Sequence, residues 1–185
     1  GEKYRYKCKK EDWGHKWESK IIDCIRFVGN CYGIGLRGKE RETAEQMKRF
    51  LTEETFSFNM RTNFKDAYRI PEQIMEYLMT WISQFFLILY PEDTVWFTDY
   101  VLEKADDQFG VYYESYFRIM MSIAKTFLKW TPNEEVPATI LKKIYLDITL
   151  KVANRYERTV WLLQLVDLMA RSKCVELAKQ AYQEM

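Results

Sequence analysis

The last thirty residues, 156–185, constrain the fold more than any other stretch. They read YERTVWLLQLVDLMARSKCVELAKQAYQEM, with apolar residues three and four positions apart. This spacing predicts two amphipathic α-helices, with a break near Ser172 and Lys173. Neither helix would be stable alone in water, because the apolar face of each must be covered by another element. We therefore expect the earlier part of the chain to supply further helices that cover them.

The upstream segments repeat the same spacing and show almost none of the two-residue alternation of β-strands. Glycines 33, 35 and 38 are expected to end the first helix, and the segment 131–137 is expected to separate two later ones. Helices joined by short turns usually pack antiparallel. The sequence therefore predicts an all-α protein of antiparallel stacked helical hairpins, a short α-solenoid or a helix bundle, in a single domain over 13–185. The expected helices are 13–32, 40–51, 71–90, 91–109, 111–130, 138–153 and the final pair.

The segment 71–90, PEQIMEYLMTWISQFFLILY, is the most hydrophobic expected helix. Its apolar residues cover much of the helix circumference, so we expect it to be buried on several sides. This interpretation depends most on the burial of Trp81, Phe85 and Phe86. In the following helix, Val95 is expected to face the core.

Composition excludes several classes of function. The chain of 185 residues has a formal net charge of +1. The protein as a whole therefore has no strong positive potential that would favour binding to nucleic acid or to an anionic membrane. The longest strongly apolar stretch, 79–90, is too short to span a bilayer. Aromatic residues make up 16% of the chain. Most should pack in the core, and some are available for a partner surface.

The four cysteines leave the compartment open. Cys24 and Cys31 lie seven residues apart on one expected helix, about 10 Å along its axis, which exceeds the reach of a disulfide. Cys8–Cys31 and Cys24–Cys174 bridges remain open for a secreted chain, while free thiols fit a reducing compartment. An intracellular location, in the cytoplasm or an organelle, is favoured, with secretion expected if the cysteines are paired.

Catalytic chemistry is not indicated. The only histidine, His15, is a weak candidate for the base that a serine or cysteine nucleophile needs. No cysteine or histidine spacing matches a metal site. Acidic pairs occur at 53–54, 106–107 and 134–135, but adjacent carboxylates on a helix point about 100° apart and do not form an acid–base couple. The sequence predicts no enzyme, metal, cofactor or small-molecule substrate.

Residues 1–12, GEKYRYKCKKED, form a basic arm in which aromatic and cationic residues alternate. This pattern can bind single-stranded nucleic acid through stacking and phosphate contacts. A solvated terminus has the same composition, so RNA ranks behind protein as the expected partner. The candidate partner-binding residues of the arm are Tyr4, Arg5, Tyr6, Lys7, Lys9 and Lys10.

Two sets of residues in the final pair of helices follow a known pattern. The first set is Leu165, Val166, Asp167, Met169, Ala170 and Arg171. The second set is Val175, Glu176, Ala178, Tyr182, Glu184 and Met185. In these positions 160–185 resembles one helical-hairpin unit of the pentatricopeptide/tetratricopeptide type, which implies stacked hairpins that approach closely at Ala178. Lys173 replaces the usual turn glycine, and Leu163 stands where RNA-reading members carry a polar base-contacting residue.

The segments KKIYLDITL (142–150) and TVWLLQLVDLM (159–169), with Trp96 and Leu102–Glu103 before them, resemble the last helices of type I interferons. This resemblance implies a secreted helical cytokine with a disulfide frame, although Thr159 stands where that family has a cysteine. The sequence favours a non-enzymatic helical binding or scaffold module that recruits a protein partner. A secreted helical-bundle cytokine is the alternative.

Overall fold

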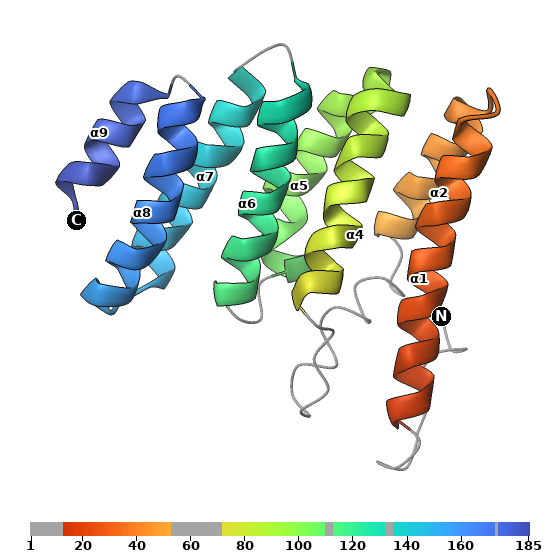
Figure 1. The fold of residues 1–185 in the computed structure, drawn as a ribbon, viewed down its shortest axis with the longest axis horizontal. Coiled ribbons are helices and arrows are strands. Elements are labelled where there is room, and N and C mark those ends of the chain that lie inside the picture. The colour runs from red at the N-terminus through yellow and green to blue at the C-terminus, as the bar shows by residue number, and fades with distance from the viewer. Residues whose placement is uncertain (1–12, 53–71, 110–112, 132–134, 173) are drawn as a thin grey trace. The chain divides into compact units, whose positions relative to one another are not determined.

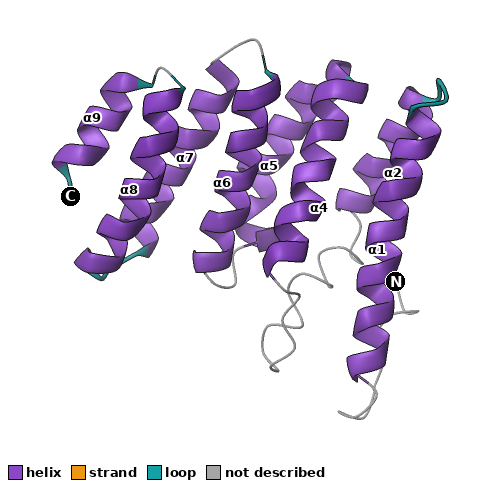
Figure 2. Cartoon of the chain, viewed as in Figure 1, coloured by secondary structure: helices purple, strands orange, loops and turns teal. Residues whose placement is uncertain are grey.

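The computed structural model describes residues 13–52, 72–109, 113–131, 135–172 and 174–185. Within these ranges all regular structure is helical and no strand occurs, which confirms the predicted all-α fold (Figure 2). None of the helices in these ranges has the length and apolar character that crossing a membrane requires. The chain divides into two compact units, Gly1–Asp93 and Thr94–Met185. The single domain expected over 13–185 remains a prediction.

The described residues of the first unit form three α-helices. These are α1 (Trp13–Gly35), α2 (Glu40–Thr52) and α4 (Glu72–Gln84), and α4 continues into a π-helical turn, η4 (Phe85–Leu89), and a 3-10 turn, η5 (Pro91–Asp93). Helix α1 packs against both α2 and α4. The rings of Phe27 and Phe50 stack between α1 and α2 with centroids 4.6 Å apart. Buried apolar side chains of this unit are Val28, Cys31, Ala44, Met47, Leu51, Leu78, Met79, Ile82, Phe85 and Phe86.

Helix α1 is longer than predicted. Gly33 lies inside it, the helix ends at Gly35, and the backbone turns to a positive φ of 85° at Gly38. The expectation that Gly33 breaks the helix was therefore wrong, whereas Gly35 and Gly38 do lie at its end. A glycine inside a helix costs only about 1 kcal/mol relative to alanine, and the packing of α1 on its neighbours offsets this.

The helix predicted over 71–90 is α4 with its π-helical continuation. Phe85 and Phe86 are fully buried, as predicted, but Trp81 is 42% exposed. The prediction for Trp81 was wrong because α4 is apolar around most of its circumference, and Tyr77 and Trp81 lie on a face that remains in solvent. The Tyr32 hydroxyl donates a hydrogen bond to the Trp81 carbonyl, so α1 holds the backbone of this residue rather than its ring.

The second unit is a stack of hairpins. It contains α5 (Thr94–Phe109), α6 (Tyr113–Trp130), α7 (Glu135–Lys151), α8 (Arg155–Arg171) and α9 (Val175–Gln183). Consecutive helices pack on one another, and α5 also packs on α7 and α6 on α8. Figure 1 shows the resulting two layers, with α6 and α8 in front of α5 and α7. This is the predicted arrangement of antiparallel stacked helical hairpins.

Two details of the second unit differ from the predictions. Val95 is 70% exposed, because it precedes the buried Phe97 by two residues and so lies roughly 200° around the helix from it. Helix α7 begins at Glu135 rather than after Pro137. The proline is accommodated because the first helical turn needs no backbone N–H from it.

Candidate interaction surface

Helix α8 carries apolar residues on two opposite faces. Its outer face exposes Tyr156, Val160 and Leu163, by 79%, 38% and 53% respectively. Their spacing of four and three residues places them in one line, about 10 Å long, which we call the outer α8 row. A helix of a soluble protein normally has only one apolar face, so packing inside the unit does not explain this row. Leu146 and Leu150 of α7 form a shorter exposed apolar pair in the same unit. The inner face of α8 buries Trp161, Leu162, Leu165, Leu168 and Met169.

The start of α8 is fixed by side-chain contacts. Asn154 caps the helix, and its Oδ1 accepts hydrogen bonds from the backbone N–H groups of Tyr156 and Glu157 at 2.9 and 3.2 Å. The Tyr113 hydroxyl of α6 donates to the Glu157 carboxylate. This bond, followed by burial, raises the pKa of Tyr113. The first turn of α8, which carries Tyr156, is thus anchored to α6, its neighbour in the same layer (Figure 1).

A charged side chain stands at the C-terminal end of the outer α8 row. Asp167 follows Leu163 by one turn on the same face, whereas Arg155 points about 100° around the helix from Tyr156, and both charged residues are exposed. The Arg171 guanidinium lies 3.1 Å from the Asp167 carboxylate. The Arg171 Nε group also donates to Asp167 Oδ1 at 3.3 Å, so both carboxylate oxygens have a partner on the same helix. An exposed pair of this kind contributes at most about 1 kcal/mol.

Helix α9 covers one side of α8 and leaves apolar side chains in solvent on its other side. Ala178 and Ala181 are buried, and the Tyr145 hydroxyl of α7 donates to the Glu184 carboxylate at the end of α9. Burial, together with this bond, raises the pKa of Tyr145 to about 12. The exposed apolar side chains of α9 are Val175 and Tyr182.

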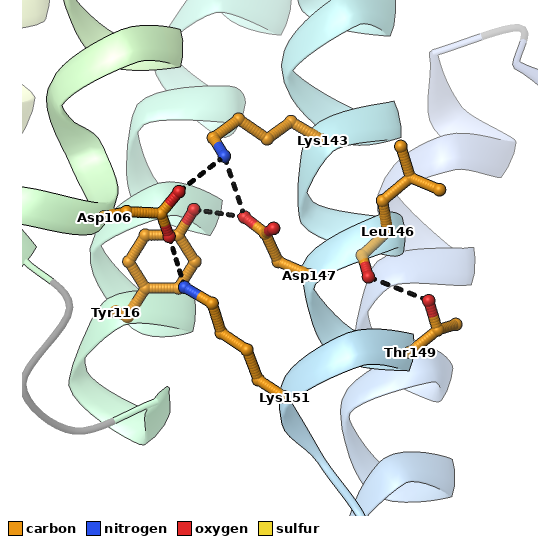
Figure 3. A network of polar contacts seen from close by, with 7 residues as sticks. All are labelled: Asp106, Tyr116, Lys143, Leu146, Asp147, Thr149 and Lys151. Atoms are coloured by element: carbon orange, nitrogen blue, oxygen red, sulfur yellow. Dashed lines mark hydrogen bonds and ion pairs between the residues drawn. The ribbon is translucent and has the colours of Figure 1, made fainter.

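A charged network lies between three helices of the same unit (Figure 3). Lys143 Nζ is 3.1 Å from both Asp106 Oδ2 of α5 and Asp147 Oδ2 on its own helix, α7. Lys151 also binds the Asp106 carboxylate, and the Tyr116 hydroxyl of α6 donates to Asp147. Two carboxylates and two ammonium groups therefore balance one another across α5, α6 and α7.

The electrostatics of this network favour the charged forms of its members. Burial alone would raise the pKa of Asp106, but hydrogen bonds from Lys151 and Lys143 lower it below its ordinary value. Burial alone would lower the pKa of Lys143, but Asp147 and Asp106 raise it. Burial and the bond to Asp147 raise the pKa of Tyr116, which keeps the phenol protonated as a donor. The Lys151 ammonium also lies 3.9 Å from the centre of the Tyr116 ring.

This arrangement suits helix packing better than catalysis. A general acid needs a carboxyl held neutral and a lysine base needs a lowered pKa, whereas Asp106 and Lys143 are shifted in the opposite directions. In the part of the chain that the structure describes, no group of three or more His, Cys, Asp and Glu side chains could hold a metal ion.

The candidate residues of the basic arm lie outside the described residues, as do the side chain of His15 and Cys8. Cys31 and Cys174 are free thiols. Cys31 is buried, and burial raises the pKa of its thiol to about 11, so it is an unreactive core residue.

No protein-family model matches the chain, and neither a curated protein nor a solved structure matches it. The resemblance of 160–185 to a helical-hairpin repeat and that of 142–150 and 159–169 to type I interferons therefore stay predictions. The geometry of α8 and its neighbours is the observation from which a function can be argued.

Proposed function

We propose that this protein is a non-enzymatic helical binding module that recruits a protein partner through the outer α8 row. The observation that carries the proposal is the exposure of Tyr156, Val160 and Leu163 in one line, on a helix whose inner face is already packed. Burying a side chain of this size contributes roughly 1.5–3 kcal/mol. Tyrosine is also enriched among the residues that dominate interface energies.

The chemistry of the row favours protein over RNA. Val160 and Leu163 offer no hydrogen-bond donor or acceptor to a base edge, and RNA recognition depends on such contacts and on stacking. RNA binding therefore rests on the basic arm alone. If the arm binds RNA, replacing Lys7, Lys9 and Lys10 by alanine should weaken binding and flatten its salt dependence.

The thiols support an intracellular location. Cys31 and Cys174 are free, and free thiols persist in reducing compartments. Four reactive thiols per chain are expected under denaturing conditions. Two or fewer would contradict this location and favour the secreted cytokine.

The binding proposal is tested by photocrosslinking in cells that express the protein. A photoreactive phenylalanine analogue replaces Leu163, and in a matched control it replaces Leu150 of α7, which is 81% exposed. We expect position 163 to capture a defined protein, and Val160→Asp in the same chain to lower the yield at least tenfold. Equal capture at both positions, or capture at 163 that Val160→Asp leaves unchanged, would contradict the proposal.

A further inference from the structure

We draw no further inference here: the strongest candidate, the exposed apolar face of α8 formed by Tyr156, Val160 and Leu163, carries nothing beyond the proposed function, because nothing in the structure shows what covers it.

Discussion

The charged network and the outer α8 row distribute polarity in opposite ways within one stack. The network brings charged side chains against the buried Tyr116 and Asp147, but each charge contacts an opposite charge or a hydroxyl. The row exposes apolar side chains that the described helices do not cover. Buried polar groups with partners are explained by folding alone, whereas an ordered line of exposed apolar groups is not. The comparison therefore assigns stability to the network, and the proposed function assigns association to the row.

The largest expected effect is the loss of stability when the charged network is disrupted. Tyr116→Ala removes a fully buried ring and the donor to Asp147, so it should lower the free energy of unfolding by roughly 3–5 kcal/mol. Urea denaturation measures the change. A loss below about 1 kcal/mol would show that the network region does not hold α5, α6 and α7 together.

A pair of neighbouring leucines separates the two faces of α8. Leu162 is fully buried and Leu163 is half-exposed. Leu162→Ala should therefore cost roughly 2–5 kcal/mol of stability, while Leu163→Ala should stay within about 0.5 kcal/mol. Denaturation curves of both variants give the comparison directly, and similar losses in the two would mean that Leu163 belongs to the core.

Removing one hydroxyl group from the network should cause a smaller loss of stability than removing the whole ring. Tyr116→Phe keeps the ring but leaves Asp147 without its phenol donor, so it should cost roughly 1–2 kcal/mol. Tyr113→Phe removes the exposed bond to Glu157 that anchors α8 to α6, and it should cost less because water replaces an exposed donor. A larger shift for Tyr113→Phe than for Tyr116→Phe would contradict the assignment of the buried bond.

The smallest expected effect is a pH dependence. Asp106 has a folded pKa below its ordinary value of 3.8, so its contribution is fully present above about pH 5 and is lost as pH falls through the folded pKa. Asp106 is half-exposed, and solvent screening limits the contribution to about 0.5–1 kcal/mol. The stability difference between the unmodified chain and Asp106→Asn should therefore be constant from pH 6 to pH 9 and shrink towards pH 3. A difference that grows on acidification would contradict the ion pairs.

The helices could be predicted from the sequence because each has a continuous inner stripe, as in α7, where Ile140, Ile144 and Ile148 are all fully buried. The buried face was predicted less well for α4. This helix is apolar around most of its circumference, so its sequence does not indicate which side packs against a neighbour. Trp81 was therefore wrongly expected in the core.

Neither part of the site was found from the sequence. The outer α8 row is interleaved with the inner face, so Leu162 and Leu163 read as one apolar run until the packing shows which is covered. The available signal was the presence of two interleaved series of apolar residues. One series is 156, 160 and 163, and the other is 162, 165 and 169. The network was hidden for a different reason: Asp106, Tyr116 and Lys143 are far apart in the chain, and only the stacking of α5, α6 and α7 brings them together.

The Asn154 cap has a consequence for kinetics. Because the first turn of α8 is already helical and held to α6 before any partner arrives, Tyr156 and the residues that follow it have little backbone entropy left to lose on association. Complex formation then requires a search over orientation but no folding step. The association rate should accordingly lie in the range typical of preformed surfaces, about 10⁵–10⁷ M⁻¹s⁻¹, and most of the difference between strong and weak variants should appear in how long the complex lasts.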